Sequence, residues 1–205
     1  MNTEDYEAII FDLGGVIINL DYDRTIKAFE EMGLSDFRSI YTQLSQSNLF
    51  DEYETGRISS QHFINKLLPY LPSGTTPNQV VAAWNAMILD VPLQKLQLLD
   101  SLRRTHKVFL LSNTNEIHMQ KVRRAWSRET DRAMESFFDH MYLSYEVGMR
   151  KPDVTIFRHV CEEQQLNEKA TLFIDDSPQH IDGAKMTGLH TIHLTDPEML
   201  YAIFS

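Results

Sequence analysis

The chain has little of what links secreted proteins covalently or anchors proteins in a membrane. It contains 205 residues and one cysteine, Cys161, so no internal disulfide can form and we expect a reducing, cytoplasmic setting. No apolar stretch approaches the ~20 residues that a membrane helix needs. The acidic N-terminus lacks the basic and apolar regions of a signal peptide. We therefore expect no membrane partner.

Basic side chains are also outnumbered, with 19 lysines and arginines against 29 aspartates and glutamates and a net charge of −10. Because nucleic-acid phosphates require a basic face, we expect no nucleic-acid partner. An acidic protein that acts on a small anionic substrate usually needs a cation at its site. The length leaves room for one medium domain, or for one domain with a large insertion.

The apolar pattern divides the chain into two kinds of sequence. Residues 18–90 show apolar side chains at helical spacing, and we expect about four helices and no strand there. After Pro92, helices alternate with short apolar strands, which indicates a parallel sheet. We predict an α/β fold with a doubly wound parallel sheet. Residues 1–17 and 91–205 would form its core, and residues 18–90 would form a helical cap inserted after the first strand.

Polar residues follow three of the predicted strands at the point where each strand ends. Asp12 follows the first apolar run, Ser112 follows a strand over residues 107–111, and Asp175 and Asp176 follow a strand over residues 171–174. In open α/β sheets ligands bind beyond the carboxyl ends of the strands. We therefore expect these residues in one crevice, with the cap above it.

These residue types suit phosphoryl transfer with a bound metal ion. A carboxylate such as Asp12 attacks phosphorus only if the phosphoryl charge is neutralised and the attack is in line. Asp175 and Asp176 supply the oxygen ligands that Mg²⁺ prefers, and the main-chain carbonyl of Gly14 is a further candidate ligand. The sequence therefore predicts a magnesium site that includes Asp12.

Two further motifs offer partners for a phosphate group. The hydroxyl and main-chain N–H groups of Ser112-Asn113 could hold a phosphoryl oxygen. The ammonium of Lys151 could offset the charge of Asp12 and of the phosphoryl group. Taken alone, each motif has an ordinary explanation, such as a tight turn, a helix cap or a surface lysine. Their joint occurrence in this order favours a functional site.

The set of motifs resembles the haloacid dehalogenase-like hydrolase superfamily, whose core is Rossmann-like. The resemblance implies that Asp12 is a nucleophile that forms an aspartyl-phosphate. It also implies that Asp12, the Gly14 carbonyl and Asp176 bind Mg²⁺, with Asp175 acting through a metal-bound water. The remaining residues would hold the substrate and its phosphoryl oxygens, and the cap would select the small phosphorylated substrate. The substrate-binding positions are Leu13, Gly14, Ser112, Asn113 and Lys151.

The sequence departs from the common family pattern at Gly14, where most family phosphatases carry an aspartate that protonates the leaving alcohol. Such a group contributes about 10²–10⁴ in rate. The stretch from Asp12 to Asp21 is similar to a bacterial subgroup that acts on α-D-glucose 1-phosphate. We hypothesise that the lack of this acid restricts turnover to leaving groups that need little protonation. Asp21 or Asp23 could replace the acid, although solvent-facing carboxylates are the more ordinary interpretation.

Two alternative functions stay open at this point. A metal-independent dehalogenase on the same fold would have no need of Asp175 and Asp176. A non-catalytic phosphate binder would be expected to lose Asp12 or Lys151, and fold alone does not exclude it. The sequence does not predict the oligomeric state. It also does not show which cap aromatics face the substrate, among them Tyr41, Phe50, Tyr53 and Phe63.

Overall fold

The computed structural model describes residues 5–34, 37 and 48–204, and its centre is a parallel sheet. The five strands lie in the order β3-β2-β1-β4-β5, and each pairs with its neighbour in parallel. This order is that of a doubly wound sheet and confirms the predicted fold class. The strands are β1 (Ala8–Phe11), β2 (Lys107–Ser112), β3 (His140–Leu143), β4 (Thr171–Asp175) and β5 (His190–His193).

The central strand β1 is buried on both faces, as its continuous apolar sequence predicts. Its register pairs Phe11 with Leu110 of β2 and with Ile174 of β4. The next residue, Asp12, therefore lies level with the ends of both neighbouring strands, and its N–H donates to the Ile174 carbonyl at 2.9 Å. Register alone brings the predicted polar residues to one edge of the sheet.

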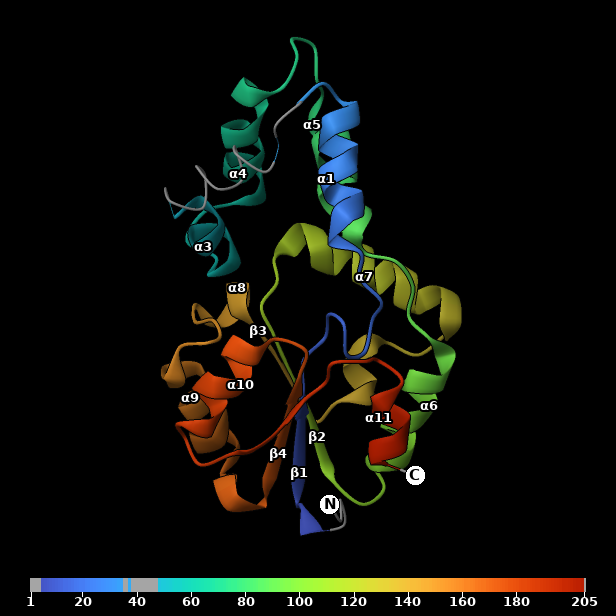
Figure 1. Ribbon diagram of the computed structural model, residues 1–205, viewed down its shortest axis with the longest axis vertical. Coiled ribbons are helices and arrows are strands. Elements are labelled where there is room, and N and C mark those ends of the chain that lie inside the picture. The colour runs from blue at the N-terminus through green and yellow to red at the C-terminus, as the bar shows by residue number, and fades with distance from the viewer. Residues whose placement is uncertain (1–4, 35–36, 38–47, 205) are drawn as a thin grey trace.

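Helices cover both faces of the sheet (Figure 1). Ile9 and Phe11 face a cluster that includes residues of α6 (Leu93–Leu102), α7 (Glu116–Glu129) and α11 (Met199–Ile203). Ala8 and Ile10 face a second cluster, built with α9 (Val154–Gln164) and α10 (Pro178–Lys185). The short helix α8 (Ser144–Val147) follows β3 directly. Alternate side chains of β1 thus pack against the helices on opposite faces of the sheet.

The inserted segment forms a third hydrophobic cluster above the carboxyl ends of the strands (Figure 1). Its described helices are α1 (Tyr22–Glu31), α3 (Leu49–Glu54), α4 (Ser60–Leu67) and α5 (Pro77–Trp84), and no strand lies among its described residues. Polar caps begin three of these helices. Asp21 accepts from the N–H of Asp23, Ser59 accepts from that of His62, and Thr76 forms a capping box with Gln79. The division at residues 18 and 91 stays a prediction.

The aromatic side chains of the insertion pack mainly on one another. Phe50, Tyr53 and Phe63 are buried, and Tyr53 stacks on Phe63 with ring centroids 4.3 Å apart. Phe50 stacks on Trp84 at 5.6 Å. These three residues therefore build the cap core, whereas Tyr41 lies outside the described residues.

Short 3-10 helices connect several elements, at Leu68–Tyr70, Asn85–Met87, Met134–Phe137 and Glu168–Ala170. No helix in the described ranges combines the length and the apolar character that a membrane span requires.

Candidate active site

The Lys151 ammonium lies between two carboxylates at the carboxyl edge of the sheet. Its Nζ donates to Asp12 Oδ1 at 2.6 Å, to Asp175 Oδ2 at 2.6 Å and to the Leu111 carbonyl at 2.8 Å. These contacts use all three N–H donors of an ammonium group. Because the Lys151 side chain is fully buried, the two carboxylates supply the charge compensation that water cannot. The predicted contact between Lys151 and a phosphoryl oxygen stays a prediction.

Burial and charge set the pKa values in this cluster. Burial raises the pKa of Asp12 to about 6, against the Lys151 ammonium that lowers it. Burial acts to lower the pKa of Lys151, but Asp12 and Asp175 outweigh it and hold that pKa above its ordinary value. For Asp175 the effect of burial is overcome by Lys151 and His180, so its pKa is lowered. The proton therefore resides on Lys151, which bridges two ionised groups at neutral pH.

Asp12, Asp175 and Asp176 form an acidic cluster that could hold a metal ion. One ligand atom from each lies within 4.8 Å of the others. Asp176 is exposed, and burial of part of its surface together with Asp175 raises its pKa. The oxygen-only donor set is the type that Mg²⁺ and Ca²⁺ prefer.

Gly15 allows Asp176 to approach the main chain of the loop after β1. Gly15 has φ of 72°, a conformation that favours glycine, and a Cβ at this position would overlap the Asp176 carboxylate. The side chain of Asp176 thus occupies the space that any larger residue at position 15 would need.

His180 belongs to the site, although its place in the sequence gives no ligand spacing that would reveal it. Its Nδ1 lies 3.0 Å from both carboxylate oxygens of Asp175. The N–H of Ser177 donates to Asp175 Oδ1 at 2.8 Å. Asp175 is therefore held by the start of α10 as well as by Lys151, which fixes its orientation.

Asn113 positions the segment that carries Lys151. Its side-chain amide donates to the Lys151 carbonyl at 2.8 Å and accepts from the Lys151 N–H at 2.9 Å. This pair of bonds ties the end of β2 to the Lys151 loop. Ser112 is buried at the same strand end. The predicted contacts of Ser112 and Asn113 with phosphate stay predictions.

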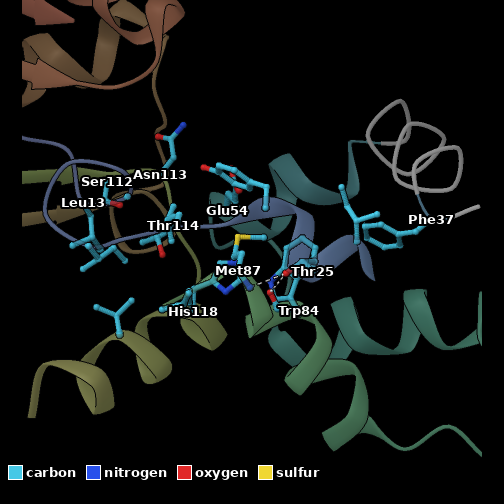
Figure 2. Close-up of a pocket in the computed structure, with 17 residues that line it drawn as sticks. Leu13, Thr25, Phe37, Glu54, Trp84, Met87, Ser112, Asn113, Thr114 and His118 are labelled. Atoms are coloured by element: carbon cyan, nitrogen blue, oxygen red, sulfur yellow. Dashed lines mark hydrogen bonds between the residues drawn. The ribbon is translucent and has the colours of Figure 1, made fainter. Parts of the chain in front are cut away.

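A cavity of about 580 Å³ lies between the residues that follow β1 and β2 and the helices of the cap (Figure 2). Leu13, Gly14, Ser112 and Asn113 line it on the side of the sheet. Two polar residues of its lining are bonded to other parts of the protein. Thr25 Oγ1 donates to the Trp84 carbonyl, and His118 Nδ1 lies 2.9 Å from Asn85 Oδ1. Much of the remaining wall is apolar, with Ile18, Leu20, Ile26, Trp84, Ile88 and Val122.

Gly14 leaves no room for a larger side chain without a change in its neighbour. A Cβ on Gly14 would lie 2.5 Å from Cδ1 of Leu20, and it would lie 4.0 Å from Asp12 Oδ2. An aspartate at position 14 would therefore require Leu20 to move.

The chain belongs to the haloacid dehalogenase-like hydrolase family, whose model matches residues 6–188. It is 32% identical over 183 residues to a D-ribitol-5-phosphate phosphatase from Bacteroides thetaiotaomicron, with 89% of each chain covered. It is 24% identical over 194 residues to a sesquiterpene phosphatase from Aspergillus oryzae, covering 93% of this chain and 91% of that one.

A solved structure has a similar fold over most of the chain. A haloacid dehalogenase family enzyme from Bacteroides thetaiotaomicron, in complex with magnesium and inorganic phosphate, superposes with a TM-score of 0.85. The identity is 36%, and the match covers 91% of this chain and 93% of that one. The predicted family is confirmed, whereas the resemblance to the glucose 1-phosphate subgroup stays a prediction.

We predict that Lys151→Met destabilises the metal-free protein by about 3–5 kcal/mol at neutral pH, because it leaves two buried carboxylates without a cation. Loss of the ammonium raises the folded-state pKa of Asp12 further above its unfolded value. It also removes the main group that lowers the pKa of Asp175, so burial raises that pKa as well. The folded variant then binds more protons than the unfolded chain. The difference in unfolding free energy between wild type and variant therefore becomes smaller as the pH falls from 8 to 5. Urea unfolding of wild type and variant at both pH values measures this.

Lys185→Met is the matched control, because the Lys185 side chain is 58% exposed in its ion pair with Asp182. We expect its unfolding free energy to change by less than about 1 kcal/mol. A Lys151→Met deficit that stays constant or widens toward pH 5 would contradict the bridging role.

Proposed function

We propose that this protein is a magnesium-dependent phosphatase that hydrolyses a small phosphorylated metabolite through an aspartyl-phosphate. The observation that carries the proposal is the buried Lys151 ammonium between Asp12 and Asp175, directly beside Asp176. Membership of the hydrolase family supports it, as do the phosphatase names of the two relatives.

Asp12 is the nucleophile in this proposal. Its Oδ1 accepts from Lys151, and its Oδ2 lies on the side of Gly14, which lines the cavity. Oδ2 forms a bond to phosphorus while the bond from phosphorus to the alcohol oxygen breaks. Lys151 keeps Asp12 ionised and oriented, which a buried carboxylate cannot achieve by itself.

Asp12, Asp176 and the Gly14 carbonyl would hold the magnesium ion, with Asp175 close by. When bound, the ion neutralises charge on the phosphoryl group. Ser112 and Asn113 would hold phosphoryl oxygens from the end of β2. Asn113 has a second task, because its side chain fixes the main chain of Lys151.

The cavity beside Gly14 would receive the alcohol part of the substrate. Its volume of about 580 Å³ is that of a typical small-molecule site. A sugar phosphate such as a hexose 1-phosphate is the first candidate substrate. The apolar wall favours a second candidate, the phosphate ester of an alcohol with an apolar body, because burying apolar surface is favourable.

We predict that Asp12→Asn abolishes magnesium-dependent phosphate release, because the amide is not a nucleophile toward phosphorus. Chelation of magnesium should stop wild-type turnover, and added magnesium should restore it. A malachite green assay with p-nitrophenyl phosphate measures both effects. Halide release from a haloacid without metal would instead support a dehalogenase, and phosphate binding without turnover would support a non-catalytic binder.

We predict that Gly15→Ala weakens magnesium binding by about 10–100-fold, the range seen when a group that orients a metal ligand is disturbed. The added methyl group would displace Asp176. Gly74→Ala is the matched control, because Gly74 also has a positive φ, of 91°, but nothing lies within 4 Å of its Cβ position. Isothermal titration with Mg²⁺ compares the two. Equal losses would show that the effect does not depend on contact with Asp176.

We predict that the cavity distinguishes substrates by the surface of the alcohol. Hexose 1-phosphate, ribitol 5-phosphate and 2-phenylethyl phosphate should be compared by kcat/KM. Leu20→Ser, which makes the wall more polar, should lower kcat/KM for 2-phenylethyl phosphate by more than for the two polyhydroxy substrates. The same loss for all three would show that the cavity does not hold the alcohol.

A further inference from the structure

The absence of a side chain at Gly14 leaves the leaving alcohol without the usual proton donor. A replacement must project into the cavity that receives the alcohol, and it must be able to hold a proton near neutral pH. Among the described residues that line the cavity, one has a carboxyl group, and it is Glu54 at the end of α3. Glu54 and Gly14 both line this cavity, and Figure 2 shows Glu54 among the lining residues.

The Glu54 carboxyl lies in largely buried surroundings and is paired with one cation. The side chain is 23% exposed. Its Oε2 atom is buried, and no described residue donates a hydrogen bond of good geometry to it. Its contact with Arg150 Nη2, at 3.1 Å, is ionic. Burial raises the pKa of Glu54, and Asp51 adds to this, against Arg150 and His180 that lower it.

The other acidic or titratable candidates are less suitable. Asp21 accepts a hydrogen bond from Asp23 at the start of α1 and forms an ion pair with Arg24, and neither aspartate lines the cavity. His118 does line it, but burial lowers its pKa to about 3, so it carries no proton to spare at neutral pH.

Arg150 connects Glu54 of the cap to the loop that carries Lys151. Its guanidinium pairs with Glu54 and with Asp51, both on α3, and its main chain precedes Lys151 directly. Two consecutive residues of one loop therefore bind different parts of the protein: Arg150 pairs with the cap, and Lys151 pairs with Asp12. This connection fixes the position of Glu54 relative to the nucleophile.

We propose that Glu54 is the general acid and base of this enzyme and takes the role for which Gly14 has no side chain. This proposal rests on the proposed phosphatase function. As the bond from phosphorus to the alcohol oxygen breaks, the Glu54 carboxyl gives its proton to that oxygen and the alcohol leaves. The Glu54 carboxylate then takes a proton from a water molecule whose oxygen bonds to phosphorus. Phosphate leaves, Asp12 is regenerated as a carboxylate, and Glu54 is protonated again.

The proposal changes what Gly14 means for the substrate. With Glu54 as acid, ordinary alcohols are competent leaving groups, and the restriction predicted from Gly14 alone disappears. The space beside Gly14 is filled by Leu20 instead, because an added Cβ would lie 2.5 Å from Leu20 Cδ1.

The test is Glu54→Gln with two substrates of similar size and different leaving groups. For 2-phenylethyl phosphate, whose alcohol must be protonated, kcat/KM should fall by about 10²–10⁴-fold. For p-nitrophenyl phosphate, whose phenolate leaves without a proton, kcat/KM should fall by less than about 10-fold. The reason is that kcat/KM reports only the steps up to formation of the aspartyl-phosphate, and this formation needs no proton donor for a phenolate. Equal losses for both substrates, or no loss for either, would overturn the assignment.

Asp51→Asn is the matched control, since it removes the other carboxylate partner of Arg150 and lies outside the cavity lining. Its effect should be the same for both substrates. A strong selective loss in Asp51→Asn would show that Glu54 acts only by holding the cap through Arg150. If wild type releases phosphate from p-nitrophenyl phosphate and Asp12→Asn does not, the phosphatase function stands whatever Glu54→Gln shows.

Discussion

The ion pairs of Lys151 are the interaction on which the rest of the site depends. A fully buried ammonium is unstable unless its charge and its three donors are met, and here Asp12, Asp175 and the Leu111 carbonyl meet them. These partners come from the ends of three adjacent strands, β1, β2 and β4. The compensation required by one cation therefore holds the ends of these strands together and favours the ionised form of Asp12.

The protein combines two separate hydrophobic units around this edge. One is the sheet with its helical layers, and the other is the aromatic cluster of the inserted helices. Arg150 and Lys151 connect the units from a single loop, because one reaches α3 and the other reaches Asp12. The cavity lies where the units meet, so its wall combines sheet-side groups that can bind phosphate with apolar groups that can bind an alcohol.

Family membership determines the chemistry of this site more closely than it determines the substrate. Two relatives are named for the phosphates of ribitol and of a sesquiterpene, alcohols with opposite polarity. Ser112 and Asn113 line the cavity from the end of a strand, whereas Ile26 and Trp84 line it from the insertion. The insertion therefore supplies part of the wall of this cavity.

Apolar runs and the residues that end them are local signals, so the parallel sheet, the helical insertion and the strand-end positions of Asp12, Ser112 and Asp175 could be predicted from the sequence. The sequence did not reveal the contact of His180 with Asp175 or the hydrogen bonds between the Asn113 side chain and the Lys151 main chain. It also did not reveal that Glu54 lines the cavity. Asn113 and Lys151 are 38 positions apart, and Glu54 lies in a helix whose local pattern indicates only burial. Such contacts arise from how the helices pack on the sheet, so they become visible only in the folded protein.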